Sequence, residues 1–153
     1  ITGGIAAYKA CGIVSFLKGQ GANVDVIMTK NACEFITPLT LETLSGNKVV
    51  TDMFERPDYI DVKHISLARK ADLFLIVPAT ANIIGKVANG IADDMLSTTI
   101  MATKAPVIFA PAMNNGMYEN RVVQDNLEKL NSSILVIPKQ SLNNLSNLAF
   151  ALG

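Results

Sequence analysis

Residues 73–82 read LFLIVPATAN, so a continuous apolar run leads directly into a turn of small and polar residues. A run of this kind is typical of a central parallel strand that helices cover on both faces. The pattern recurs at residues 107–118, where VIFA is followed by PAMNNGMY. In open parallel sheets, ligands bind in the crevice at the carboxyl ends of the strands. The two stretches therefore predict an α/β sheet with a polar crevice along one edge.

The rest of the chain alternates between helical and strand-like segments. We expect helices over residues 6–20, 83–102 (divided near Gly90), 119–130 and 142–152, with short helices after Pro38 and from His64. We expect strands over residues 24–28, 73–77, 107–110 and 134–137. This alternation predicts the α/β class: a three-layer α/β/α sandwich around a Rossmann-like or flavodoxin-like parallel sheet, with residues 1–153 forming a single domain. Because the chain opens on a strand-to-helix turn, we also expect residues before Ile1, and an omission near Lys139.

The composition excludes several classes of partner. Thirteen Lys and Arg residues balance thirteen Asp and Glu residues among 153. The sequence has no basic stripe interleaved with aromatic residues, and this argues against binding to nucleic acid. No apolar run is long enough to span a bilayer, which argues against a membrane protein. Cys11 and Cys33 lack metal-ligand spacing, so we expect no metal site and two reduced thiols in a cytoplasmic protein.

Two polar turns in the first half of the chain are candidate ligand contacts. The turn Gly3-Gly4-Ile5 would let backbone N–H groups approach a phosphate, although a tight turn without a ligand explains it equally well. It lacks dinucleotide-binding spacing, so a mononucleotide is the better candidate. Thr29 follows the strand expected over residues 24–28, where its hydroxyl would contact a ribityl chain or phosphate. The alternative is that Thr29 or Asn31 caps the helix that follows.

The two turns after the apolar strands offer further candidates. Thr80 and Asn82 have groups that donate to phosphate or carbonyl oxygens, and Asn82 is alternatively a helix cap. Asn114 has a carboxamide suited to a carboxylate or amide ligand. Met113 and Met117 are adaptable apolar side chains, for which core packing is the alternative interpretation.

His64 is the only imidazole in the sequence, so acid–base chemistry near neutral pH would pass through it. A role in packing or at the surface is the alternative for this single histidine. Asp93 and Asp94 are interpreted as the acidic start of a helix.

Six segments, taken in order, resemble the flavin-containing cysteine decarboxylases, and among them the phosphopantothenoylcysteine decarboxylases of coenzyme A biosynthesis. The segments are GGIAAYK at residues 3–9, TKN at 29–31, HISL at 64–67, PATAN at 78–82, NGIAD at 89–93 and PAMNNGMY at 111–118. The resemblance covers nearly the whole chain and is more specific than any one segment.

This resemblance implies an FMN-dependent lyase that decarboxylates 4′-phosphopantothenoylcysteine to 4′-phosphopantetheine. It implies FMN contacts from Gly3, Gly4, Ile5, Thr29, Thr80, Ala81, Asn82 and Ile83. It further implies that Asn114, with Met113 beside it, holds the substrate carboxylate, and that His64 is the catalytic base. In this family the cysteine side chain is oxidised to a thiocarbonyl. When carbon dioxide leaves, the thiocarbonyl accepts the electron pair of the broken carbon–carbon bond. The resemblance also implies a homotrimer or dodecamer with FMN at a subunit interface, and fusion to, or joint action with, phosphopantothenoylcysteine synthetase.

Three departures from the family pattern keep alternatives open. Ile83 stands where the family has Thr, and Tyr118 stands where it has Trp. No cysteine follows Cys33, so the flap cysteine that protonates the intermediate in the coenzyme A enzymes is missing from these 153 residues. Either the flap is omitted, which the abrupt passage at residues 139–141 favours, or the reaction stops at the enethiol. The alternatives are an oxidative decarboxylase of a peptide C-terminal cysteine and a non-catalytic flavin-binding regulatory subunit.

Overall fold

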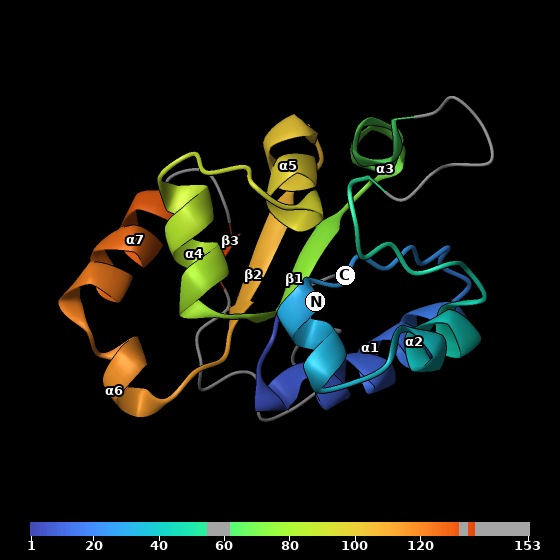
Figure 1. Ribbon diagram of the computed structural model, residues 1–153, viewed down its shortest axis with the longest axis horizontal. Coiled ribbons are helices and arrows are strands. Elements are labelled where there is room, and N and C mark those ends of the chain that lie inside the picture. Colours follow the sequence, from blue (N-terminus) through green and yellow to red (C-terminus); the bar gives the residue numbers. More distant parts are fainter. Residues whose placement is uncertain (55–61, 132–134, 137–153) are drawn as a thin grey trace.

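A computed structural model describes residues 1–54, 62–131 and 135–136, in which helices alternate with parallel strands (Figure 1). In chain order the elements are the 3-10 helix η1 (Ile5–Tyr8), α1 (Lys9–Gly19), the 3-10 helix η2 (Lys30–Glu34), α2 (Pro38–Ser45), α3 (Lys63–Lys70), β1 (Phe74–Ala79), α4 (Ala81–Ala88), α5 (Met95–Ala102), β2 (Val107–Pro111), α6 (Asn115–Tyr118), α7 (Arg121–Asn131) and β3 (Leu135–Val136). These elements confirm most of the predicted helices. The helix expected over residues 142–152, and the passage near residue 139, lie outside the described residues.

The sheet pairs β1, β2 and β3 side by side in that order, and both pairings are parallel. Ile76 pairs with Phe109 and Ala79 with Pro111, so β1 and β2 end at the same level. The Ala112 N–H donates to the Ala79 carbonyl at 3.0 Å and continues this alignment past the strand ends. The polar turns that follow the two strands are therefore neighbours.

The strand predicted over residues 24–28 is wrong, because only one isolated parallel bridge, between Ile27 and Val50, forms there. Each neighbour of this segment pairs through a single residue. Val50 exchanges hydrogen bonds with Val26 and Met28 on one side. On the other side, the Ile1 nitrogen donates to the Ile27 carbonyl and the Ile1 carbonyl accepts from Thr29 N–H. These contacts align the three segments with one another, but they are too brief for regular strands to form, and the sheet itself contains only β1, β2 and β3.

The side on which successive segments of the chain are added reverses beside Ile1 and Thr2. From this segment the chain first adds residues 26–28 and then Val50 on one side. It then adds β1, β2 and β3 in turn on the other side, where the Thr2 hydroxyl donates to the Pro78 carbonyl of β1 at 2.7 Å. Such a reversal is the switch point at which open α/β sheets bind ligands.

Helices cover both faces of the sheet, which confirms the three-layer α/β/α architecture. On one face the fully buried Ile76 and Phe109 join a core built from α4, α5 and α7. On the other face Ile108 packs against Ile13 of α1, with Leu75 beside them. Figure 1 shows α4 next to α7 on one side of the strands and α1 next to α2 on the other.

Turn and cap residues account for where several helices begin and end. Pro38 occupies the first turn of α2, and Gly46 ends that helix with a φ of 73°. Gly90 adopts a φ of 71° between α4 and α5, at the predicted division. No helix within the described part of the chain is both long and apolar enough to cross a membrane.

Replacing Phe109 with alanine should lower the free energy of unfolding by about 3–5 kcal/mol, because the change opens a cavity at the centre of the sheet. Urea unfolding followed by circular dichroism measures this difference. The matched control is Val122→Ala on the exposed side of α7, for which we expect a change within about 0.5 kcal/mol. Equal losses in the two variants would contradict the assignment of Phe109 to the core.

Candidate functional site

A cavity of about 1740 Å³ lies at the carboxyl ends of the parallel strands. Residues 2–5 and 29–31 line it on one side of the switch point, and residues 80–83 and 110–114 line it on the other. Small-molecule pockets typically measure roughly 300–1,000 Å³. The space therefore suffices for a cofactor together with a substrate.

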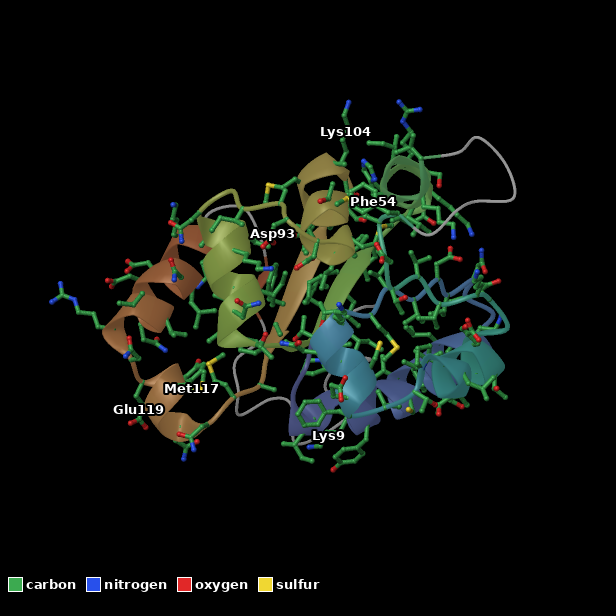
Figure 2. All side chains as sticks on the ribbon, viewed as in Figure 1. Lys9, Phe54, Asp93, Lys104, Met117 and Glu119 are labelled. Carbon is green, nitrogen blue, oxygen red and sulfur yellow. The ribbon has the colours of Figure 1, made fainter. Side chains whose placement is uncertain are left out.

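Figure 2 labels four of the lining residues and shows that they come from separate parts of the fold. Lys9 begins α1, Phe54 follows the bridge residue Val50, Asp93 precedes α5, and Met117 lies in α6. In this view Lys9 lies below the lower end of β1, Met117 lies to its left, and Asp93 and Phe54 lie above it. The cavity is thus bounded by elements that are far apart in the sequence.

Gly3 and Gly4 line the cavity for different physical reasons. A Cβ at Gly3 would lie 2.5 Å from the Asn31 Cβ and 2.7 Å from the Asn31 carbonyl carbon, so a side chain there would overlap the 29–31 turn. A Cβ at Gly4 would meet only the Thr80 methyl, at 3.7 Å, which is an ordinary contact. Gly3 therefore allows the two turns to approach each other, whereas Gly4 leaves open space on the cavity side.

The structure tests the helix-cap interpretation of the polar residues beside these turns. The Thr29 hydroxyl accepts from Ala32 N–H at 3.3 Å, which confirms the helix-cap interpretation and leaves the hydroxyl proton available for a ligand. Asn82 lies within the first turn of α4, so the alternative interpretation of Asn82 as a cap is wrong. Thr80 is the residue at the cap position, and its side chain makes no capping hydrogen bond.

The start of α4 presents backbone donors to the cavity. The first N–H groups of a helix have no acceptor within the helix, and the Thr80 side chain does not supply one. Ala81, Asn82 and Ile83 all line the cavity. The Ile83 side chain packs in the main hydrophobic core.

Asn114 and the two methionines form the part of the lining that follows β2. The Asn114 carboxamide oxygen accepts from Gly116 N–H at 2.9 Å and caps α6. This bond leaves the exposed amide NH₂ free to donate to a ligand. Met113 both lines the cavity and packs against the main core, whereas Met117 lines it and is half exposed. The packing interpretation of Met113 is therefore confirmed, and its contact with a substrate stays a prediction.

A partly exposed ion-pair cluster forms another part of the lining. Lys86, whose side chain is 18% exposed, places its Nζ 2.6 Å from Asp93 Oδ1 and 2.7 Å from Asp94 Oδ2. Asp94 also caps α5, since its Oδ1 accepts from Ser97 N–H at 2.8 Å. The prediction that this acidic pair begins a helix is confirmed, and the pair additionally faces the cavity.

The cluster shifts two pKa values in opposite directions. Burial alone would lower the pKa of Lys86, but its hydrogen bonds to Asp93 and Asp94 hold that pKa above the usual lysine value. Burial alone would raise the pKa of Asp94, but Lys86 and the Ser97 donors hold that pKa below the usual aspartate value. Lys86 and Asp94 are therefore both charged at neutral pH.

The structure does not bring His64 to the cavity of this chain. His64 lies in the first turn of α3, half buried, and it is absent from the residues that line the cavity. The α3 helix is attached to its surroundings by the Thr103 hydroxyl, which donates to the Ala68 carbonyl at 2.9 Å, and by the 2.6 Å ion pair of Lys70 with Asp25. The role assigned to His64 remains a prediction.

Sequence reasoning missed the contributions of Thr2 and Lys86. Thr2 is buried, lines the cavity and donates a hydrogen bond to β1. The sequence pattern that could have identified it is a hydroxyl residue directly before two glycines. Lys86 lies four residues after Asn82, a spacing that places both on one face of a helix. Within the described ranges, no group of three His, Cys, Asp or Glu side chains is arranged to hold a metal ion.

Residues 1–147 of the chain match the family model described as Flavoprotein. The chain belongs to this family. It is 53% identical over 130 residues to the coenzyme A biosynthesis bifunctional protein CoaBC of Bacillus subtilis (strain 168), a match that covers 85% of this chain and 32% of the relative. The chain thus spans about a third of the length of the curated relatives that it matches.

Solved structures place the fold in the same family. The FMN-dependent cysteine decarboxylase TvaF from thioviridamide biosynthesis superposes with a TM-score of 0.85 and 29% identity, covering 99% of this chain and 91% of that one. A mutant PPC decarboxylase complexed with pantothenoylaminoethenethiol superposes with a TM-score of 0.76 and 32% identity, covering 90% of this chain and 78% of that one. These matches confirm the predicted relationship to the flavin-containing cysteine decarboxylases.

Replacing Gly3 with alanine should disturb the first turn, because the new methyl group would overlap main-chain atoms of residue 31. We expect a loss of thermal stability in the ligand-free protein, measured by differential scanning fluorimetry. The matched control is Gly4→Ala, which meets only an ordinary contact in an extended backbone and should melt close to the wild-type temperature. A Gly3→Ala protein as stable as Gly4→Ala would contradict this account of the turn.

Replacing Asp94 with asparagine should keep the α5 cap oxygen while removing the charge that pairs with Lys86. We expect a loss of about 1 kcal/mol in the free energy of unfolding at neutral pH. Because the folded-state pKa of Asp94 is lowered, this contribution is present above the ordinary aspartate pKa and disappears as the pH falls through the lowered value. Urea unfolding across a pH series measures it, with the exposed Asp72→Asn variant as control. A difference that grows on acidification would contradict the prediction.

Proposed function

We propose that this chain binds FMN and decarboxylates the cysteine moiety of 4′-phosphopantothenoylcysteine, giving 4′-phosphopantetheine and carbon dioxide. It would then be a carbon–carbon lyase of coenzyme A biosynthesis. The observation that carries the proposal is the single cavity that the Gly3-Gly4 turn, the start of α4 and the Asn114 segment line together. The 53% identity to a coenzyme A biosynthesis protein supports this substrate over other cysteine compounds.

The donor set of the cavity fits FMN. The backbone N–H groups of Ala81, Asn82 and Ile83 at the start of α4 suit a phosphate or a ring carbonyl oxygen. The Thr29 and Thr80 hydroxyls on either side suit a ribityl chain, and the open backbone at Gly4 allows close approach. Bound FMN would supply two-electron oxidation of the cysteine side chain, which lets the substrate accept the electrons released with carbon dioxide.

We assign the substrate carboxylate to Asn114. The carboxamide oxygen of Asn114 is fixed as the cap of α6, so its NH₂ group has a defined direction from which to donate. Met113 beside it supplies an apolar contact for the rest of the cysteine moiety. Binding the carboxylate in a largely apolar cavity orients the scissile carbon–carbon bond against the cofactor.

We propose that a second copy of the chain completes the site. His64 is the assigned base, yet it does not line the cavity of its own chain. Two apolar side chains of the lining are strongly exposed, Ile5 at 79% and Phe54 at 83%, as an interface near the cavity would require. This arrangement fits the homotrimer or dodecamer expected from the sequence.

The domain assignment is also a proposal. We propose that residues 1–153 are the FMN-binding decarboxylase domain, and that it is fused to or acts with phosphopantothenoylcysteine synthetase. The support is that the CoaBC relatives are named bifunctional and that the matched region is about a third of their length. The cytoplasmic location expected from the sequence stays a prediction.

A second candidate activity is oxidative decarboxylation of a peptide that ends in cysteine. The absence of any cysteine after Cys33 favours it, because the expected proton donor for the final reduction is missing from these 153 residues. The similarity to the peptidyl-cysteine decarboxylase EpiD, with a TM-score of 0.77 and 26% identity, points the same way. The two activities differ by two hydrogens in the product, since one ends at a thiol and the other at an enethiol.

The deciding experiment combines spectroscopy with product analysis. Purified protein should show a flavin absorption spectrum and release FMN on denaturation. Incubation with 4′-phosphopantothenoylcysteine, and separately with a peptide ending in cysteine, should give carbon dioxide and the thiol product from the first substrate only. A protein that neither contains nor takes up FMN would falsify the proposal, and enethiol formed from the peptide alone would favour the second candidate. Bound FMN with no turnover of either substrate would indicate the regulatory subunit.

Replacing His64 with asparagine should reduce carbon dioxide release at least about a hundredfold, because general acid–base catalysis typically contributes that much. FMN content should stay at the wild-type value, since the groups assigned to FMN belong to the Gly3-Gly4 turn, Thr29 and the start of α4. Mass spectrometry of the product and the absorption spectrum measure the two effects. The matched control is Arg69→Gln, an exposed position on the same helix, which should keep full activity. Normal turnover in the His64 variant would remove its assigned role.

A further inference from the structure

Thr2 is a buried polar residue to which no binding or catalytic role has been assigned above. Its residue surface is only 2% exposed, although the residue lines the cavity and directly precedes the Gly3-Gly4 turn. A buried hydroxyl without partners would cost stability, so its partners indicate what it does.

Both of those partners lie across the switch point. The Thr2 hydroxyl donates to the Pro78 carbonyl at 2.7 Å and accepts from Thr80 N–H at 3.1 Å. The two bonds span 76 and 78 positions of sequence, and they join the first turn to the end of β1. With its proton donated and Thr80 N–H accepted, the hydroxyl is engaged in both directions by the protein itself.

The bond to Thr80 also fixes how α4 begins. Thr80 is held in an extended conformation, with φ −78° and ψ 161°, and its own side chain does not fold back to cap the helix. The first donors of α4 are consequently left directed at the cavity. Across the crevice, a Cβ added at Gly4 would lie 3.7 Å from the Thr80 methyl, so the two turns lie close to each other.

We propose that Thr2 is a positioning residue that sets the spacing between the Gly3-Gly4 turn and the start of α4, and thereby prepares the site for FMN. The proposal rests on the proposed function for the identity of the ligand. It assigns Thr2 no direct contact with the flavin, since its proton is donated to the Pro78 carbonyl and its oxygen accepts from Thr80 N–H. The two hydrogen bonds, and not the bulk of the side chain, carry the effect.

Four variants separate the hydroxyl from the volume of the side chain. Thr2→Val removes the hydroxyl at similar size, and Thr2→Ser keeps the hydroxyl without the methyl group. Thr2→Cys is a milder change, because a thiol is a weak donor and acceptor, and it replaces Thr2→Val if that variant does not fold. Thr99→Val is the matched control, since Thr99 is also fully buried but donates within α5 to Met95 and does not line the cavity.

The first readout needs no flavin. Hydrogen–deuterium exchange on the ligand-free protein, resolved at the Thr80 amide, should be about tenfold faster in Thr2→Val than in wild type. Thr2→Ser and Thr99→Val should leave exchange at this amide unchanged. If Thr2→Val leaves the Thr80 amide as protected as it is in wild type, the Thr2 hydroxyl does not hold Thr80 in place and the proposal is disproved.

The second readout is FMN titration followed by flavin absorption and fluorescence. We expect the dissociation constant to rise roughly tenfold or more in Thr2→Val, with an altered flavin spectrum, because the loss of two aligned bonds misplaces the donors. Thr2→Ser should restore both, and Thr99→Val should resemble wild type even if it melts at a lower temperature. Faster Thr80 exchange with unchanged FMN affinity would overturn the positioning role. Failure of the wild-type protein to bind FMN would instead reject the proposed function. The exchange result would still decide whether the Thr2 hydroxyl holds Thr80 in place.

Discussion

The parallel pairing of β1 with β2 is the constraint on which the site depends. Ala79 pairs with Pro111, and the Ala112 N–H donates to the Ala79 carbonyl, so the two strands release the chain at the same level. A side-chain core centred on Ile76 and Phe109 holds this register from one face. Any slip in it would separate the donors of α4 from Asn114, although neither segment would change its own conformation.

Local sequence patterns predicted the elements whose interactions are short in range. The apolar runs at β1 and β2, the break at Gly90 and the cap at Gly46 depend on residues within a few positions of one another. The strand expected at residues 24–28 was wrong, because a strand depends on partners that the local pattern does not contain. Its neighbours at Ile1 and Val50 each contribute a single pairing residue.

The same distinction applies to the site. Gly3, Gly4, Thr80 and Asn114 were identified from motifs, and the cavity brings them together. The interpretation of Asn82 as a helix cap failed because α4 begins at Ala81, two residues earlier than the motif suggested. Contacts that cross the fold were out of reach of sequence reasoning, since nothing in the local sequence indicates that the Thr2 hydroxyl meets a carbonyl 76 positions away. His64 is the converse case, because its chemistry is evident from its residue type while its place in a working site depends on more than this chain's own fold.

The close approach of Gly3 to residue 31 has a consequence for how this turn can vary. The atoms nearest to a hypothetical Gly3 Cβ are the Cβ, the carbonyl carbon and the carbonyl oxygen of Asn31. The last two belong to the main chain and are identical whatever amino acid occupies position 31. No compensating substitution at residue 31 can therefore make room for a side chain at residue 3, and accommodation would require the backbone of one turn to move. Position 3 is in this sense restricted by the path of the chain, independently of any ligand that the cavity receives.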